Sequence, residues 1–250
     1  KFLAAVDKNT VLAACMAVNN ETGARQDIAA LAKGIKAKNS RTHFHVDAVQ
    51  AWLRIPIDLQ KWPGVDTLSV SGHKIHAPKG IGALYIRQGL PLKPFILGGG
   101  QENGLRSGTE PTGQIAAFAV ACQTGKAKMA QSLAHMNQLK AYTLERLHAE
   151  VPQVEEIISG DAPHILALTL PGYKSEVLVR VMGDKGVCIS AGSACHRGKA
   201  SHVYEVMGLT KPQRDGAFRV SFSDWSTKED VDCFVQALKE TQEMLFPTMS

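Results

Sequence analysis

The sequence predicts an α/β protein in which a mostly parallel sheet with flanking helices precedes a smaller α+β region. A short apolar run with the character of a buried strand, residues 10–18, and a second strand-like segment, residues 42–50, are separated by a helix-like segment. In that segment Asp27 can cap a helix whose apolar positions recur at helical spacing from Ile28 to Ile35. A strand, a helix and a second strand in this order form a βαβ unit, which joins parallel strands.

Shorter patterns predict the elements that follow. Residues 66–74 and 81–86 have the pattern of two further strands. Residues 112–149 have a long helical pattern, in which Gly125 predicts a break or a bend.

We place a domain boundary inside this long helical segment. Residues 1–125 then form a larger domain and residues 126–250 a small C-terminal α+β domain. The elements predicted for the small domain are strands at 164–170, 186–190 and 217–222 and helices at 175–182 and 227–245.

Composition and charge exclude several classes of function. With 250 residues, 44% of them hydrophobic and 20% charged, the chain has an ordinary globular composition. The formal charge of +5 is mild and scattered, which does not indicate a nucleic-acid partner, and no apolar run approaches the roughly 18 residues of a membrane span. The five cysteines are odd in number and lack zinc-ligand spacing, which predicts no metal site and a reducing compartment, the cytoplasm or, in a eukaryote, an organellar matrix.

Polar residues gather where the predicted strands end. Asn20 follows the first strand, Asp47 ends the second, and Ser71, His73 and Lys74 follow at the exit of the third. In open α/β sheets, ligands bind beyond the carboxyl ends of the strands. We therefore expect these side chains to converge on one edge of the sheet.

Lys74 is the first candidate for chemistry in this group. A desolvated lysine can hold a carbonyl cofactor such as pyridoxal phosphate (PLP) as a Schiff base. PLP also needs a carboxylate at its ring nitrogen, a donor to its phenolate oxygen and donors to its phosphate, roles that Asp47, Gln50 and the pair Ser71 and His73 would fill. The alternative is that Lys74 is an ordinary surface charge.

Two further positions have polar groups that could bind an anion. The glycine-rich segment 97–111 lacks a Walker motif but offers Arg106 and Thr109 as phosphate donors; alternatively it is a flexible connector. Arg219 alternates with apolar residues in the strand 217–222 and needs a carboxylate partner, which either a substrate or a structural acidic residue could provide.

Cys195 lies in the segment 190–201, which is rich in small residues and predicts a mobile loop. His196, Arg197 and Lys199 surround it with positive charge, which favours the reactive thiolate. The alternative is a free surface thiol. The remaining cysteines lie in apolar patterns and are expected to pack in the core: Cys15, Cys122, Cys188 and Cys233.

These segments together resemble a known family. In order and rough spacing, the chain is similar to the cysteine desulfurases, class V aminotransferase relatives of PLP fold type I, and most closely to the group that serves iron–sulfur cluster assembly. The resemblance covers nearly the whole chain and rests on "VNNETG", "HVDAVQ", "SVSGHKIHAPKGIGALY", "GGGQENGLRSGTEP", "SAGSACHRG" and "FRVSFSDW". It implies that residues 1–125 are an incomplete PLP-binding large domain and that residues 126–250 carry the cysteine loop.

The resemblance implies a role for each residue of the lysine cluster. Lys74 would form the Schiff base with PLP, Asp47 would pair with the pyridinium nitrogen, and Gln50 would contact the phenolate oxygen. Ser71 and His73 would bind the cofactor phosphate.

It also implies roles outside that cluster. Asn20 would lie by the cofactor and substrate, and Thr109 would reach a phosphate across the interface of a homodimer. Arg219 would hold the substrate carboxylate, and Cys195 would be the nucleophile that accepts sulfur, able to contact a cluster transiently.

The implied activity is PLP-dependent removal of sulfur from L-cysteine, giving L-alanine and a persulfide on Cys195 that passes to an acceptor or scaffold protein. One alternative is a selenocysteine lyase or another PLP-dependent lyase, in which Cys195 is dispensable or selects selenium. Another is a non-catalytic piece that binds a partner and retains vestigial motifs.

The chain departs from the family pattern in two ways. Family members have a phosphate-binding turn and a ring-stacking histidine before the point where this sequence begins, so we expect either another chain to supply them or weak PLP binding. The segment "SAGSACHRG" also carries more charge after the cysteine than is usual in the family.

Overall fold

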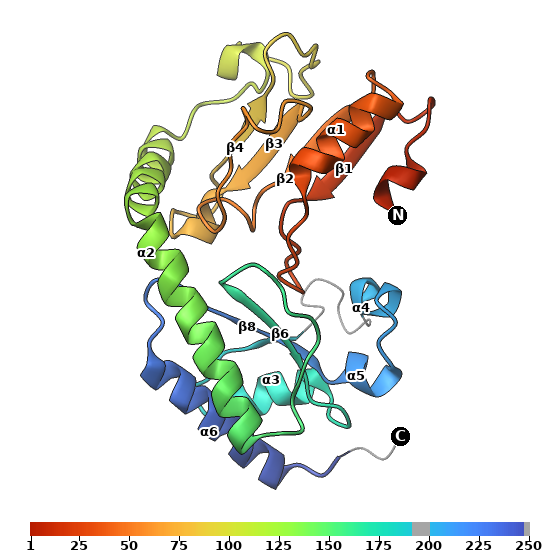
Figure 1. Cartoon of the computed structure of the whole chain (residues 1–250). Coiled ribbons are helices and arrows are strands. Elements are labelled where there is room, and N and C mark those ends of the chain that lie inside the picture. The colour runs from red at the N-terminus through yellow and green to blue at the C-terminus, as the bar shows by residue number, and fades with distance from the viewer. Residues whose placement is uncertain (192–200, 248–250) are drawn as a thin grey trace. The chain divides into compact units, whose positions relative to one another are not determined.

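The computed structural model describes residues 1–191 and 201–247, which form two compact units. The first unit comprises Lys1–Val18 and Gln26–Met129, and the second comprises Asn19–Arg25 and Ala130–Ser250. The units thus change over inside the long helix α2 (Thr112–Glu150), and a short loop of the first half of the chain belongs to the second unit (Figure 1). Our division into domains at residue 125 stays a prediction.

The first unit contains a four-stranded sheet with strands in sequence order. The strands are β1 (Leu12–Met16), β2 (His43–Asp47), β3 (Thr67–Ser71) and β4 (Gly82–Ile86). The first three are parallel, and β4 pairs antiparallel with β3. The predicted mostly parallel sheet is confirmed.

Helix α1 (Ile28–Lys38) covers one face of this sheet. It begins where the side chain of Asp27 accepts a hydrogen bond from the Ala30 amide at 3.0 Å, which confirms the predicted cap. Side chains alternate along β2, so that Phe44 and Val46 are completely buried on the helix-covered side while Asp47 points to the opposite face.

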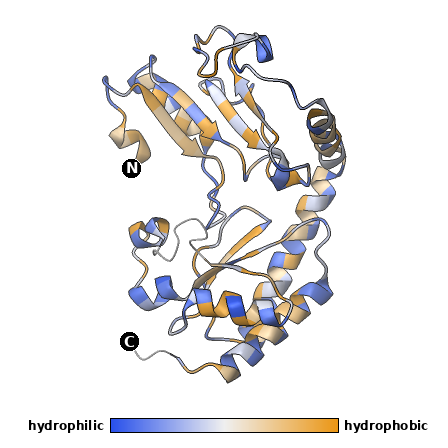
Figure 2. Ribbon diagram, turned by 180° about the vertical axis from the view of Figure 1, so that it is seen from behind, coloured by the Kyte–Doolittle hydropathy of each residue, from blue (hydrophilic) through white to orange (hydrophobic). Residues whose placement is uncertain are grey.

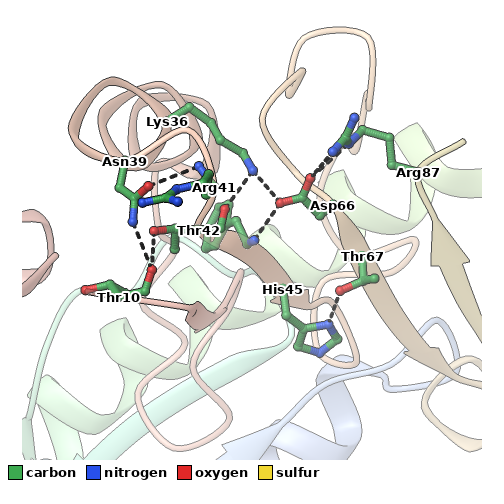
Figure 3. Close-up of polar contacts among 10 residues, drawn as sticks. Thr10, Lys36, Asn39, Arg41, Thr42, His45, Asp66, Thr67 and Arg87 are labelled. Atoms are coloured by element: carbon green, nitrogen blue, oxygen red, sulfur yellow. Dashed lines mark hydrogen bonds and ion pairs between the residues drawn. The ribbon is translucent and has the colours of Figure 1, made fainter. Parts of the chain in front are cut away.

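A buried carboxylate holds together the amino-terminal ends of β2 and β3 (Figure 3). The side chain of Asp66 is fully buried and accepts from Lys36 Nζ at 2.5 Å, from the Phe44 amide at 2.7 Å and from Arg87 Nε at 2.9 Å. The ends of β2 and β3 that carry the candidate site residues are the opposite, carboxyl ends.

Short 3₁₀ helices and the first part of the long helix α2, up to Met129, complete the first unit. The 3₁₀ helices are η1 (Phe2–Ala5), η2 (Gly72–Ile75) and η3 (Glu102–Gly104). Of the predicted break or bend near Gly125, the break is wrong, because helix α2 is continuous; the bend stays a prediction. An internal glycine costs a helix only about 1 kcal/mol relative to alanine, which a helix of this length tolerates. Here a Cβ on Gly125 would come within 2.7 Å of Leu53 Cδ1, so the glycine permits a close approach.

The second unit contains an antiparallel sheet of order β5-β6-β8-β7. Its strands are β5 (Glu155–Glu156), β6 (Ile165–Thr169), β7 (Ser190–Ala191) and β8 (Ala217–Ser221). Strand β6 is fully buried. The strand predicted at 186–190 is mostly wrong, because within that range only Ser190 belongs to β7.

In the described part of this unit, the sheet is accompanied by helices α3 (Ser175–Asp184), α4 (His202–Val206), α5 (Lys211–Asp215) and α6 (Lys228–Met244). The ribbon of α6 shows alternating hydrophilic and hydrophobic bands, and its buried residues include Phe234 and Leu238 (Figure 2). It begins with a capping box, in which the Thr227 side chain accepts from the Asp230 amide at 3.2 Å and the Asp230 side chain accepts from the Thr227 amide at 2.9 Å. The small α+β region is therefore as predicted. Among the described residues, no helix has the length and hydropathy that a membrane span requires.

Candidate functional site

The carboxyl ends of β2 and β3 place a carboxylate and a hydroxyl on one face of the first sheet. Asp47 is the last residue of β2, is half-buried, and pairs in register with Ser69 of β3. Ser71 ends β3 two positions later and therefore points to the same face. The Asp47 Oδ1 atom accepts a hydrogen bond from the Val49 amide at 2.9 Å, which fixes the orientation of the carboxylate.

The tight turn η2 holds the serine, histidine and lysine of the candidate site together. Ser71 Oγ and His73 Nδ1 lie 2.8 Å apart. Lys74 is half-buried, and its backbone carbonyl accepts a hydrogen bond from Nη2 of the buried Arg54 at 3.3 Å. Gly72 is needed in this turn, because a Cβ there would lie 2.8 Å from Ile81 Cγ2. The sheet edge thus carries an amine, an imidazole, a hydroxyl and a carboxylate on neighbouring strands.

Two predicted residues of the first unit lie outside this turn. Gln50 is half-buried in the turn that follows β2, three residues after Asp47. Thr109 is exposed in the loop before α2, where Arg106 Nη1 donates to the Ser107 carbonyl at 3.1 Å. The role of Thr109 across a dimer interface stays a prediction.

His45 is a polar neighbour of Asp47 on β2, and its ring contacts side chains of β3. Its Nδ1 lies 2.8 Å from Thr67 Oγ1 (Figure 3). Its Nε2 lies 3.4 Å from Ser69 Oγ. Because His45 and Asp47 are two residues apart on a strand, they share one face. That spacing was the available signal, but the partners depend on the pairing of β2 with β3.

In the second unit, Arg219 has both Nη atoms of its guanidinium hydrogen-bonded, and its Nε has no partner among the described residues. Nη1 donates to the backbone carbonyl of Asn20 at 2.5 Å, and Nη2 donates to Ser190 Oγ at 3.3 Å. Nε is buried and has no hydrogen-bond partner among the residues that the structure describes. A carboxylate binds arginine well through two parallel N–H bonds, and the Nε and Nη2 edge offers such a pair.

The loop that carries Asn20 is fixed by its own side chains. Asn19 Oδ1 accepts from the amides of Glu21 and Thr22, both at 2.9 Å. The Gly23 amide donates to the Asn19 carbonyl at 3.0 Å. Asparagine closes such turns because its side chain can replace a backbone acceptor. The Asn20 carbonyl is thereby held in a defined position toward Arg219.

The candidate nucleophile, Cys195, lies outside the described residues. The prediction that the other cysteines pack in the core is wrong for Cys188 and Cys233, which are exposed, while Cys15 and Cys122 are half-buried. Cys233 lies on the side of α6 away from Val231, because two residues turn a helix by about 200°. Burial raises the pKa of the Cys15 thiol.

The chain belongs to the class-V aminotransferase family, whose sequence model, described as "Aminotransferase class-V", matches residues 1–234. Its curated relatives include a cysteine desulfurase of Trichormus azollae, 36% identical over 97% of this chain and 61% of that protein. Another is "Cysteine desulfurase IscS" of Serratia proteamaculans, 36% identical over 95% of this chain and 59% of that protein. The predicted resemblance to cysteine desulfurases is confirmed.

Solved structures agree with the sequence relatives. A "NIFS-like protein" superposes with a TM-score of 0.89 and 34% identity, covering 98% of this chain and 64% of that one. A NifS-like protein from Rickettsia africae superposes with a TM-score of 0.86 and 29% identity, covering 96% of this chain and 64% of that one. The fold is therefore that of PLP fold type I enzymes, as predicted. The chain spans about three fifths of the length of the curated relatives cited above.

Proposed function

We propose that the natural protein that contains this chain is a PLP-dependent cysteine desulfurase, which converts L-cysteine to L-alanine and leaves a persulfide on Cys195. The observation that carries the proposal is the shared sheet edge of Asp47 and the group Ser71, His73 and Lys74. The relatives support it, because they are named cysteine desulfurases at 36% identity.

The residues of this edge fit PLP chemically. Ser71 and His73, 2.8 Å apart, offer a hydroxyl and an imidazole to a phosphate group. The Asp47 carboxylate is oriented by the Val49 amide and would hold the proton on the pyridine nitrogen. Lys74 offers the amine that the cofactor aldehyde needs. When bound, PLP supplies an electron sink for the pair of electrons left on the substrate Cα.

Lys74 and Cys195 would do the chemistry on the substrate. The Lys74 amine would take the proton from the substrate Cα and return a proton later in the reaction. The Cys195 thiolate would attack the substrate sulfur, so that an S–S bond forms and the C–S bond breaks. The electrons of the broken bond remain with the carbon portion, which is protonated and released as alanine.

Arg219 would bind the substrate carboxylate. Its Nε is a buried donor without a partner in the described chain, which is an unfavourable state that an incoming carboxylate would relieve. We further propose a homodimer in which Thr109 contributes to the partner's phosphate site, an acceptor protein for the persulfide sulfur, and a reducing cellular compartment.

The test uses the PLP-loaded natural protein with Lys74→Ala and, as a matched control, Lys79→Ala, since Lys79 is an exposed lysine of the same segment. We expect Lys74→Ala to lose the visible absorption band of lysine-bound PLP and the production of alanine, while Lys79→Ala keeps both. A Lys74→Ala protein that keeps the band and the activity contradicts the proposal. A second variant, Cys195→Ala, separates the desulfurase from a selenocysteine lyase when it is assayed with cysteine and selenocysteine in parallel. If the variant loses activity on cysteine but keeps it on selenocysteine, the selenocysteine lyase is favoured.

A further inference from the structure

The loop Asn19–Arg25 is fastened to the second unit by a neighbouring loop. The amide of Ala162 donates to the Gly23 carbonyl at 3.0 Å. Gly160 lies against the same loop so closely that a Cβ would come within 2.4 Å of the Thr22 carbonyl oxygen. The position of the segment that carries Asn20 thus depends on the position of the loop around Gly160.

Lys140 of helix α2 holds that neighbouring loop in turn. Its side chain is buried, with 9% of the residue exposed, and its Nζ donates to the Gly160 carbonyl at 2.5 Å and to the Ala162 carbonyl at 3.4 Å. Burial lowers the pKa of this ammonium group, while the negative charges of Glu156 and Asp161 act in the opposite direction.

Burying a lysine ammonium group to hold a loop carries an unfavourable desolvation free energy. Removing a charged ammonium group from water is unfavourable, whereas an apolar residue of similar length would fill the same space without a desolvation penalty. The ammonium group fixes the orientation of the loop, because the two carbonyls that accept its hydrogen bonds must point toward Nζ. The residues on either side of Asp161 are therefore fixed in orientation as well as in position.

The contacts continue from Lys140 to the guanidinium of Arg219. Lys140 fixes the carbonyls of Gly160 and Ala162, and these two residues fix Thr22 and Gly23. The loop that contains Thr22 and Gly23 presents the Asn20 carbonyl, which accepts from Arg219 Nη1. This acceptor sets the rotation of the guanidinium and so the direction of its Nε and Nη2 edge.

We propose that Lys140 is a positioning residue for recognition of the substrate carboxylate, acting through the loop at Gly160 and the Asn20 carbonyl on Arg219. The inference rests on the proposed function, in which Arg219 binds that carboxylate. A group that only orients a binding residue affects substrate affinity more than the chemical step.

The test is Lys140→Met in the PLP-loaded natural protein, with Lys128→Met as the matched control, because Lys128 is an exposed lysine of the same helix. We expect Lys140→Met to raise the KM for L-cysteine by about tenfold, as loss of one well-oriented charge-assisted contact does, with kcat changed by less than about threefold. The absorption band of bound PLP stays unchanged, and Lys128→Met behaves as the unmodified protein.

A binding measurement separates carboxylate recognition from a general structural effect. L-alanine carries the carboxylate and ethylamine is the same molecule without it; binding of each is followed by the change in the visible absorption of the cofactor. Lys140→Met should weaken the binding of L-alanine about tenfold and leave the binding of ethylamine unchanged. Equal weakening of both ligands, or an unchanged KM, overturns the proposal.

A second variant and a double variant keep the test decisive. Gly160→Ala disturbs the contact with Thr22 while leaving Lys140 in place, and it should reproduce the KM effect. In a protein that already carries Arg219→Ala, Lys140→Met should raise the KM for L-cysteine little further, since both substitutions act on the contact of Arg219 with the substrate carboxylate. If neither Lys140→Met nor Gly160→Ala yields a folded protein, Lys140 is a structural residue and the proposal fails. An Arg219→Ala protein with unchanged KM refutes instead the role of Arg219 in the proposed function.

Discussion

Arg219 donates from its Nη1 to the backbone carbonyl of Asn20 at 2.5 Å, although the two residues are 199 positions apart. The acceptor belongs to the main chain, so it does not depend on the side chain of residue 20. A backbone acceptor held by an asparagine-closed turn cannot rotate away, in contrast to a carboxylate side chain. The arginine is thus oriented without being neutralised, which leaves its charge for a ligand.

Arg219→Lys should weaken substrate binding although it keeps the positive charge. A lysine ammonium cannot serve the Asn20 carbonyl, Ser190 and a bidentate carboxylate at once, because it lacks the planar fork. We expect the KM for L-cysteine to rise about 10- to 100-fold in the PLP-loaded natural protein, with a smaller change in kcat. Steady-state kinetics measure this.

The control for that substitution is Arg180→Lys, an exposed arginine of α3. It should leave both constants unchanged. A KM that is the same for Arg219→Lys and Arg180→Lys means that Arg219 does not recognise the carboxylate through its fork.

The local elements and the first half of the site could be predicted because their signals lie close together in the sequence. The cap at Asp27 and the ends of β2 and β3 depend on residues within a few positions of one another. The strand alternation then places Asp47 and Ser71 on one face.

The features that the sequence did not predict depend on contacts between residues that are far apart in the chain. The partners of His45 follow from the register of β2 with β3, and the attachment of the loop Asn19–Arg25 to the second unit depends on Lys140 and Arg219. A buried lysine in a helix has the same local pattern as a solvated one. Cys188 lies next to the half-buried Val187 and was assigned to the core because its neighbours are apolar, but it is exposed.

Asp66→Ala should destabilise the first unit more than the loss of a single exposed ion pair does. The substitution leaves the Phe44 amide unpaired and separates Lys36 and Arg87 from their shared carboxylate (Figure 3). Breaking a buried ion pair costs about 3–5 kcal/mol, and we expect the lower end, about 3 kcal/mol, because both cations remain partly solvated. The free energy of unfolding in urea measures the loss.

Asp58→Ala is the matched control, because Asp58 is half-exposed and lies 3.5 Å from the exposed Lys61. Exposed pairs contribute about 0–1 kcal/mol, so its effect should be small. Similar losses for Asp58→Ala and Asp66→Ala would show that the buried carboxylate does not stabilise the sheet.

The same carboxylate predicts a loss of stability in acid. Burial alone would raise the pKa of Asp66, but the hydrogen bonds from Lys36, Phe44 and Arg87 outweigh it and hold the pKa below its usual value. A lowered pKa in the folded state means that the contribution is fully present above the unfolded-state pKa of about 3.9 and is lost as the pH falls through the folded-state value.

The measurement compares the unmodified protein with Asp66→Asn in urea at several pH values. We expect their difference in unfolding free energy to be constant at neutral pH and to narrow below about pH 4, because the amide of the variant does not titrate whereas the carboxylate of Asp66 becomes neutral. A difference that grows on acidification would mean that the carboxyl is destabilised by its surroundings.

The thiols outside the segment 190–201, which carries Cys195, should react at different rates with a small alkylating reagent. Cys188 and Cys233 are exposed, whereas Cys15 is half-buried with a raised pKa, so less of it is thiolate at neutral pH. We expect iodoacetamide to modify Cys188 and Cys233 well before Cys15 in the native protein, and all three at similar rates in urea; peptide mass spectrometry resolves the sites. Native modification of Cys15 as fast as Cys233 would contradict the placement of β1. Any labelling assay of Cys195 therefore needs a background of Cys188→Ser and Cys233→Ser, in which the remaining fast-reacting thiol can be attributed to the proposed nucleophile.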